Sequence, residues 1–357
     1  MDILILTGKF GMGHWSASRS LQEQLAREGH QVSVVDLFDY AMPELAPAMY
    51  RGFNFLVTYV GGIYNAFHRM TRDAEGEVPL AGQFIRRLGR LLAAARPELV
   101  ISTHPVCSGV VSRYKQERCS GLPLVTCITD VTCHSEWIHP GTDCYLVASD
   151  TVRDGLASKG VDRRRILVTG IPVREQFCGE LRREDGPRQL LIMGGGLGLM
   201  PRREAFYEAL NALPDVHTTI LTGKNQELYR RLHGRYEHIE AVPFTDEVYR
   251  YMGRAHLMLS KPGGITAFEA IAARLPMLAW EPFLEQEREN ARYLVAHGMA
   301  RIAAREESAC LAAIRETIYD RKLLKDMETA MEEQARTLCP AAVCDVVKTL
   351  TGEEVCA

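Results

Sequence analysis

The chain has 357 residues, of which 46% are hydrophobic and 24% charged, a composition typical of globular proteins and sufficient for two cores of ordinary size. The formal net charge of −3 gives no reason to expect a nucleic acid partner. An apolar strand follows Met1 directly, and the longest apolar run (52–67) holds two asparagines, so neither a leader nor a membrane span is expected. Ten cysteines without a CxxC pair favour reduced, buried thiols over a metal centre and indicate a cytoplasmic protein.

The first half of the chain alternates short apolar segments with helical ones. We expect a helix from Ser16 to Gly29, and continuous apolar runs predict parallel strands covered on both faces. These strands are expected at 2–6, 31–37, 98–103, 122–129 and 143–149.

One connection, from Leu37 to Glu98, is far longer than a single helix requires. Its segment 46–73 combines aromatic side chains with arginines. This mixture suits contact with a membrane surface, and it suits equally a set of helices that cap the N-terminal core.

The second half begins after a charged stretch at 175–189, where a new strand, glycine turn and helix appear at 189–206. Further strands are expected at 217–223, 238–244, 256–260 and 276–280. The pattern predicts an α/β fold with two doubly wound Rossmann-like domains that face a cleft. The domains are expected at 1–175 and 186–335, followed by a helical tail at 336–357, for which packing on the N-terminal domain is one arrangement.

Two glycine turns precede helices. The first ends at Gly13 and is followed by His14, and the second contains Gly194, Gly195, Gly196 and Gly198. Backbone N–H groups at a helix start favour a phosphate. Neither turn matches the dinucleotide fingerprint or a Walker loop, and tight turns without a ligand would explain the same glycines.

A third turn, Pro262-Gly263-Gly264, lies between a strand and a helix, with Glu269 one to two turns into that helix. A carboxylate there can accept hydrogen bonds from both hydroxyls of a ribose, so this segment predicts a nucleotide site. On the next helix Gln286 and Asn290 share a face, which suits sugar hydroxyls as well as a solvated helix start.

In the N-terminal half, the segment 129–140 places Asp130, His134 and Trp137 after a strand. Side chains at the carboxyl ends of parallel strands face the ligand site in such folds. A structural Asp–His pair is the alternative interpretation.

Together these motifs resemble those of the GT-B glycosyltransferases that include monogalactosyldiacylglycerol synthases and bacterial processive diacylglycerol glucosyltransferases. The resemblance lies in ILILTGKFGMGH (3–14), TDVTCHSEWIHP (129–140), VTGIPVREQF (168–177), SKPGGIT (260–266) and EQERENA (285–291). It implies an inverting enzyme that moves a hexose from UDP-glucose or UDP-galactose to diacylglycerol or a glycosyl-diacylglycerol, with the UDP-sugar as co-substrate and neither cofactor nor metal. It also implies peripheral association with an anionic membrane surface, at the inner face of the cell membrane.

The resemblance further implies site residues. His14 would be the general base, kept neutral at the positive end of its helix, with Asp130 orienting it or replacing it. The UDP-sugar would be held by Gly13, Arg174, Gly195, Gly196, Phe244, Thr245, Gly263, Gly264, Glu269, Gln286, Glu287 and Asn290. The acceptor and the membrane would contact Trp15, His134, Trp137, Arg51, Phe53, Phe55 and Arg69.

Three alternatives stay open at this point: a glycosyltransferase with a soluble or different lipid acceptor, an NAD(P)-dependent oxidoreductase, and a non-catalytic nucleotide-sugar binding protein. The family's Pro-Gly-Gln before the donor-sugar segment is replaced here by residues 283–286, so the hexose is open as well. Trp15 stands where the plant enzymes have a basic residue, which leaves the acceptor head group open.

Overall fold

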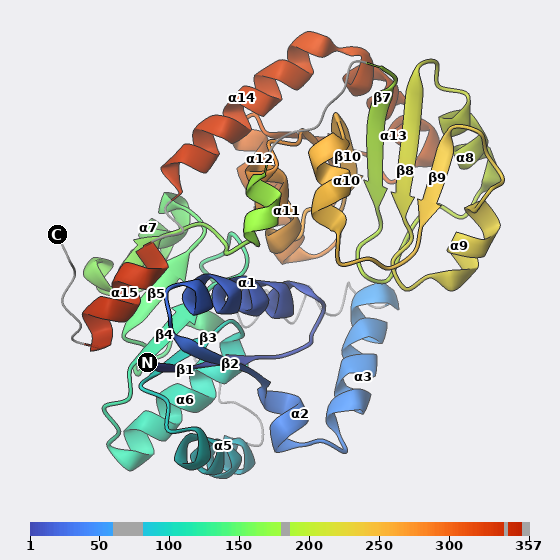
Figure 1. Ribbon diagram of the computed structural model, residues 1–357. Helices are drawn as coiled ribbons and strands as arrows, with labels where there is room; N and C mark the ends of the chain where they lie inside the picture. The colour runs from blue at the N-terminus through green and yellow to red at the C-terminus, as the bar shows by residue number, and fades with distance from the viewer. Residues whose placement is uncertain (60–80, 180–185, 339–341, 352–357) are drawn as a thin grey trace. The chain divides into compact units, whose positions relative to one another are not determined.

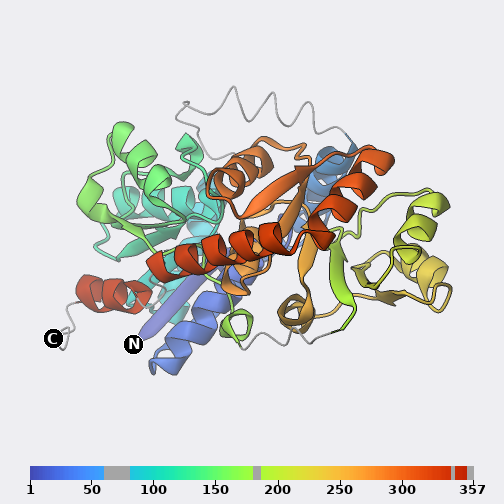
Figure 2. The same ribbon diagram turned by 90° about the horizontal axis from the view of Figure 1, so that it is seen from above.

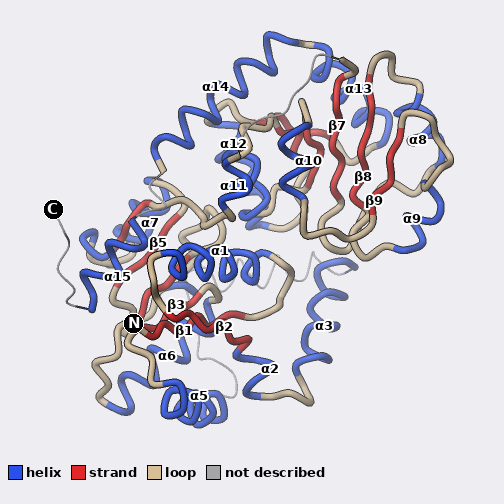
Figure 3. Tube along the Cα trace, in the orientation of Figure 1, coloured by secondary structure: helices blue, strands red, loops and turns tan. Residues whose placement is uncertain are grey.

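The computed structural model describes residues 1–59, 81–179, 186–338 and 342–351. The chain divides into two compact units. The N-terminal unit comprises Met1–Arg174, Leu284–Gln286 and Leu338–Ala357, and the C-terminal unit comprises Glu175–Phe283 and Glu287–Thr337. In each unit helices flank a parallel sheet, as the ribbon and the tube show (Figures 1, 2 and 3), which confirms the expected α/β class.

The sheet of the N-terminal unit has six strands in the order β2-β1-β3-β4-β5-β6, all of them parallel. The strands are β1 (Asp2–Thr7), β2 (Gln31–Asp36), β3 (Leu99–Ser102), β4 (Leu124–Cys127), β5 (Cys144–Val147) and β6 (Ile166–Val168). The described helices are α1 (Gly13–Arg27), α2 (Leu37–Ala41), α3 (Ala46–Tyr59), α5 (Ala81–Ala95), α6 (Pro105–Arg118), α7 (Asp150–Ser158) and α15 (Ala342–Thr351), with short 3₁₀ turns at Ser135–Trp137 and Arg163–Arg165.

Side chains of β1 alternate between two cores, because successive residues of a strand point to opposite faces. Leu4 and Leu6 pack with residues of α2, α5 and α6, such as Phe38. Ile3 and Ile5 pack with residues of α1 and with four residues of α15 (Val343, Cys344, Val346 and Val347). The helical segment near the end of the chain thus completes one face of this sheet.

The sheet of the C-terminal unit also has six parallel strands, in the order β12-β11-β10-β7-β8-β9. They are β7 (Arg188–Met193), β8 (Val216–Leu221), β9 (Ile239–Val242), β10 (Leu257–Ser260), β11 (Met277–Trp280) and β12 (Ala300–Ala303). The helices are α8 (Glu204–Asn211), α9 (Gln226–Leu232), α10 (Val248–Arg254), α11 (Gly264–Ala272), α12 (Glu285–Ala296), α13 (Glu307–Tyr319) and α14 (Arg321–Thr337), with a 3₁₀ turn at Glu175–Cys178.

Two local features differ from the expectations. Strands β6 and β12 were not expected, because both are short edge strands and exposed Arg301 interrupts the apolar pattern of β12. The first helix begins at Gly13, not at Ser16, so His14 lies in its first turn. Of segment 46–73, only α3 lies within the described residues; Arg69 lies outside them.

No helix in the described part of the chain is both long enough and apolar enough to cross a bilayer.

Candidate active site

His14 is held by two oxygen atoms at the ends of neighbouring strands, one from the backbone and one from a side chain. Its Nδ1 lies 2.8 Å from the carbonyl oxygen of Thr103 and 2.9 Å from Oγ1 of Thr129. A carbonyl oxygen only accepts hydrogen bonds, so Nδ1 carries the proton of the neutral ring. The lone pair of Nε2 is then available to accept a proton.

Buried hydroxyls fix the position of Thr103. Its Oγ1 donates to Oγ1 of Thr7 at 2.9 Å and lies 2.8 Å from Oγ of Ser18. The Ser18 hydroxyl also donates to the carbonyl oxygen of His14 at 2.9 Å. Residues from the ends of β1 and β3 and from the second turn of α1 therefore hold the partner of the imidazole rigidly.

Burial keeps His14 neutral. The side chain is partly exposed, yet enough protein surrounds the ring for burial to lower its pKa from 6.5 to about 4, against smaller opposing effects of the Thr103 hydrogen bond and the Glu136 charge. The neutral state of His14 was expected from the helix dipole, whereas burial is the largest cause of its lowered pKa. The ring is therefore in its proton-accepting form at neutral pH.

A second histidine stands beside the first. The ring centroids of His14 and His104 are 4.8 Å apart. His104 accepts a hydrogen bond at Nδ1 from the N–H of Val106 at 3.2 Å, as the N-cap of α6, and its pKa is lowered chiefly by burial and also by His14. Sequence reasoning missed His104, Thr103 and Thr129; the signal was that each lies where an apolar strand ends.

The segment after β4 carries three more of the predicted site residues, one of which packs near His14. Trp137 is buried, with its ring centroid 6.1 Å from that of His14. His134 is also buried, and its Nδ1 accepts from the N–H of Glu136 at 3.2 Å, so it caps the 3₁₀ turn at Ser135–Trp137. Asp130, next to Thr129 in the chain, is partly exposed; its part in catalysis stays a prediction.

Helix α3 and the first turn of α1 carry further residues predicted for the acceptor and the membrane. Arg51 and Phe55 are exposed, Phe55 to 60%. Phe53 is half-buried, with its ring 5.3 Å from that of Phe10. Trp15 is partly exposed and lies 5.0 Å, at its ring centroid, from the ammonium group of Lys9.

In the C-terminal unit, the predicted nucleotide turn joins β10 to α11. Gly263 is the N-cap of α11, and glycine has no side chain to cap the first N–H groups of a helix, which suits an anion. Among the described residues, no atom lies within 4 Å of a Cβ placed on Gly263. Asn290 is fully buried and donates from Nδ2 to the carbonyl oxygen of Pro262 at 3.0 Å. This hydrogen bond anchors the turn to α12. Glu269, in the second turn of α11, is partly exposed.

The turn after β7 is anchored to the segment after β8. The carbonyl oxygens of Gly196 and Gly198 accept from the Lys224 N–H at 3.0 Å and from Nδ2 of Asn225 at 3.1 Å. Gly195 is exposed with a φ of 71°, so its backbone is accessible. The turn therefore has a fixed shape and an open outer side.

Phe244 follows β9 and is 44% exposed, with the Lys224 ammonium 5.9 Å from its ring centroid. Oγ1 of Thr245 accepts from the N–H of Glu247 at 3.0 Å. An exposed aromatic ring of this kind can stack on a flat base. The sequence reasoning missed Lys224.

The start of α12 holds the predicted donor-sugar residues. Glu287 is largely buried and accepts at Oε2 from the N–H of Phe283 at 3.3 Å, while Gln286 is partly exposed. Arg174, partly exposed, is the last residue of the first segment of the N-terminal unit.

Two family models match the chain: "Monogalactosyldiacylglycerol (MGDG) synthase" over residues 14–173, and "Glycosyltransferase family 28 C-terminal domain" over residues 189–342. The chain is therefore a glycosyltransferase, whose first half matches one of these families and whose second half matches the other. Between them the two matches include His14 as well as the Pro262–Gly264 turn.

Curated relatives of this glycosyltransferase include proteins named processive diacylglycerol beta-glucosyltransferase. The protein of Staphylococcus carnosus is 29% identical, and the alignment covers 93% of this chain and 88% of the relative. That of Bacillus cereus strain AH187 is 28% identical, with 98% and 93% covered.

Solved structures share the GT-B fold of this glycosyltransferase. MurG of Acinetobacter baumannii matches with a TM-score of 0.66 at 18% identity, covering 98% of this chain and 99% of that one. A UDP-GlcNAc 2-epimerase from Neisseria meningitidis matches with a TM-score of 0.62 at 15% identity, covering 98% and 99%. Since an epimerase shares the fold, the reaction has to be argued from the site.

Proposed function

We propose that this protein is an inverting glycosyltransferase that moves glucose or galactose from a UDP-sugar to diacylglycerol, or to a glycosyl-diacylglycerol, at a membrane surface. The observation that carries the proposal is the state of His14: a neutral ring with its proton on Nδ1, held by the Thr103 carbonyl. The related diacylglycerol glucosyltransferases support the choice of donor and acceptor.

The reaction needs one proton transfer and one displacement at carbon. Nε2 of His14 takes the proton of the acceptor hydroxyl as its oxygen forms a bond to the anomeric carbon. The bond from that carbon to the diphosphate oxygen breaks, and UDP leaves with the electron pair. Attack from the opposite side converts an α-linked donor into a β-glycoside.

In this proposal the C-terminal unit supplies all but one of the groups that hold UDP, and no metal ion takes part. Backbone N–H groups at Gly264, where α11 begins, and at Gly195 and Gly196 face the diphosphate, and Arg174 adds a positive charge. Glu269 accepts from the ribose hydroxyls, Phe244 stacks on uracil, and Gln286 and Glu287 contact the sugar.

The acceptor side of the proposal places α3 at the surface of an anionic bilayer on the cytoplasmic side. Exposed Arg51 and Phe55 on one helix combine a charge for lipid head groups with an apolar ring for the interface. A soluble acceptor is the second candidate, and in that case α3 serves only to cover the core.

One observation argues against a dinucleotide-dependent oxidoreductase. Such enzymes use an acidic residue near the end of the second strand to bind a ribose. Here Asp36 occupies that place, but it is 7% exposed and accepts hydrogen bonds from the N–H groups of Phe38 and Asp39 and from the Tyr50 hydroxyl. These hydrogen bonds occupy the carboxylate of Asp36, so it is not available to bind a ribose.

The test is UDP release from a panel of UDP-sugars, with diacylglycerol in anionic vesicles, for the wild type and His14→Ala. We expect release that requires one UDP-hexose together with the lipid, and a loss of roughly 10²- to 10⁴-fold in the variant. His238→Ala, which removes an exposed histidine of the C-terminal unit, is the matched control. Thermal protection by UDP-sugars without lipid-dependent turnover would contradict the acceptor, and no effect of UDP compounds would contradict the whole proposal.

A further inference from the structure

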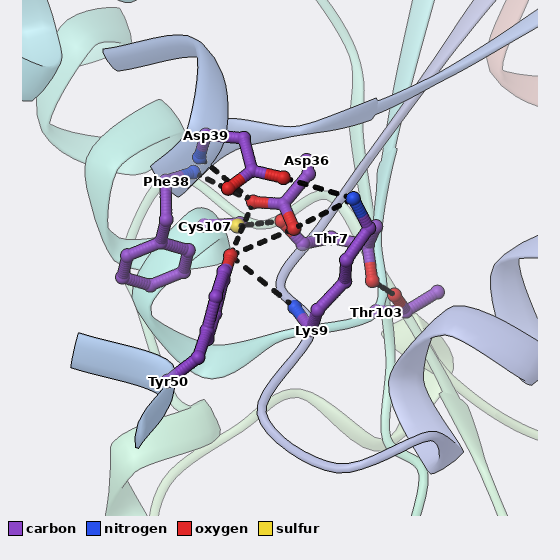
Figure 4. A network of polar contacts seen from close by, with 8 residues as sticks. All are labelled: Thr7, Lys9, Asp36, Phe38, Asp39, Tyr50, Thr103 and Cys107. Carbon is purple, nitrogen blue, oxygen red and sulfur yellow. Dashed lines mark hydrogen bonds and ion pairs between the residues drawn. The ribbon is translucent and has the colours of Figure 1, made fainter. Parts of the chain in front are cut away.

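A cluster of polar side chains joins α3 to the turn that precedes His14 (Figure 4). At its centre the carboxylate of Asp36 caps α2, accepting from the N–H groups of Phe38 and Asp39 at 3.0 Å each. The Tyr50 hydroxyl donates to this carboxylate, with both oxygens 2.7 Å away. Tyr50 is on α3, so this bond attaches α3 to the end of β2.

The same hydroxyl also reaches the turn. The backbone N–H of Lys9 donates to the Tyr50 oxygen at 3.5 Å, and the ring of Phe10 lies 4.8 Å from the Tyr50 ring. The Lys9 ammonium binds Asp39 at 2.8 Å and lies 3.9 Å from Asp36. Two consecutive residues of the turn are therefore anchored around one tyrosine.

These anchors matter because the turn itself is rich in glycine. Gly8 and Gly11 allow many backbone conformations, and Gly11 has a φ of 75°. The contacts of Lys9 and Phe10 with Tyr50 therefore determine the conformation of this turn. The turn leads directly into the first turn of α1, where His14 must meet the Thr103 carbonyl.

We propose that Tyr50 is a positioning residue: its hydroxyl fixes the turn of residues 8–12, and through it His14, to α3. Tyr50 acts through the turn and does not itself touch the reacting atoms. Burial, and then the hydrogen bond to Asp36, raise the pKa of Tyr50 well above 10, so the hydroxyl remains a donor throughout the working pH range. The effect on turnover rests on the proposed function, whereas the effect on the turn does not.

The test compares Tyr50→Phe with Tyr114→Phe. The first variant keeps the ring packing on Phe10 and removes only the oxygen. Tyr114 packs in the same core, and the structure records no hydrogen bond of its hydroxyl to any described residue, so its variant controls for loss of a hydroxyl.

The first readout is amide hydrogen exchange, which needs no substrate. In Tyr50→Phe we expect exchange at residues 8–14 to become roughly tenfold faster, with β5 and α7 unchanged. Tyr114→Phe should match the wild type throughout. Unchanged exchange at residues 8–14 in Tyr50→Phe would overturn the proposal, as would an equal acceleration across the entire N-terminal unit, since that would indicate general destabilisation.

The second readout is steady-state kinetics on vesicles. Tyr50→Phe should lower kcat severalfold while leaving the KM for the UDP-sugar unchanged, because the residues that hold the UDP-sugar in the proposed function above are on other elements. A raised donor KM with unchanged kcat would contradict positioning of His14. If exchange rises as expected but the wild type turns over no UDP-sugar, the proposed function fails and the role of Tyr50 in the turn stands.

Discussion

The carbonyl oxygen of Thr103 lies 2.8 Å from Nδ1 of His14. This single contact places the proton of the neutral imidazole on one nitrogen and leaves the other as a base. Because the partner is a main-chain oxygen, no substitution of the Thr103 side chain removes it directly. The backbone at the end of β3 therefore determines which nitrogen of His14 can accept a proton.

The pH dependence of turnover should follow the lowered pKa of His14. Burial brings that pKa to about 4, so the base is neutral throughout the range above about pH 5. We expect kcat/KM to be level between pH 5.5 and 7.5 and to fall only near pH 4. A half-loss of kcat/KM close to pH 6.5, in pH-profiled UDP release, would show that the ring titrates as it does in water.

The same pKa shift predicts a pH dependence of stability. The unfolded chain binds a proton at His14 near pH 6.5 and the folded chain only near pH 4, so stability is greatest above 6.5 and is lost as the pH falls toward 4. The wild type should lose up to about 1.4 kcal/mol per pH unit more than His14→Gln over that window. Urea unfolding at pH 7.5, 6 and 5 measures both proteins, and burial, the main cause of the lowered pKa of His104, acts in each of them. Parallel pH profiles would contradict the shift.

Substitution of Thr129 should lower kcat without abolishing turnover. Its hydroxyl lies 2.9 Å from Nδ1 of His14, but the Thr103 carbonyl remains as a partner. Thr129→Val keeps the shape and removes one neutral hydrogen bond, so kcat should fall about two- to tenfold. Thr129→Ser keeps the hydroxyl and should retain most of the activity. A loss in Thr129→Val as large as that in His14→Ala would mean that the carbonyl alone does not hold the ring.

Two glycines of the C-terminal unit should respond differently to alanine. A Cβ on Gly198 would lie 1.9 Å from the Thr222 carbonyl oxygen, at a φ of 61°, so Gly198→Ala must displace the turn and should destabilise the protein by more than about 1 kcal/mol. The methyl group of Gly263→Ala would lie in open space among the described residues. The variant should therefore lower the free energy of unfolding by less than about 1 kcal/mol, which is the difference between glycine and alanine at an N-cap.

The two variants also separate stability from donor binding. Gly263→Ala should raise the KM for the UDP-sugar while thermal unfolding changes little, because its methyl group would occupy the space that the diphosphate needs. Thermal scans with and without UDP provide the measurement. An unchanged donor KM in Gly263→Ala would remove this turn from the proposed site.

The sequence predicted the sheets well because a parallel strand covered on both faces is a continuous apolar run, as Ile3–Leu6 and Leu190–Met193 are. Edge strands β6 and β12 lack that signal. The glycine turns were identified as sites by their position between strand and helix. The hydrogen bonds that anchor these turns, from Asn290 to Pro262 and from Asn225 to Gly198, were not predicted, since the partners are distant in sequence.

The environment of His14 was the least predictable part. The motif identified the histidine, but its partners come from the ends of β3 and β4, about 90 and 115 residues away along the chain. Their position after an apolar strand marks such residues as candidates, but the sequence does not show which strand ends are neighbours. Their role follows only once the order β1-β3-β4 brings those ends together.

The packing of α15 on the face of β1 has a consequence for biosynthesis. Val343, Val346 and Val347 share a core with Ile3, Leu21 and Leu25, yet residues 175–337, most of which form the C-terminal unit, are translated between them. The nascent N-terminal unit therefore leaves the ribosome with part of one apolar face uncovered while most of the second unit is still being made. We expect that interval to be when the chain depends most on chaperones, and folding of the first unit to be completed only after synthesis of the second.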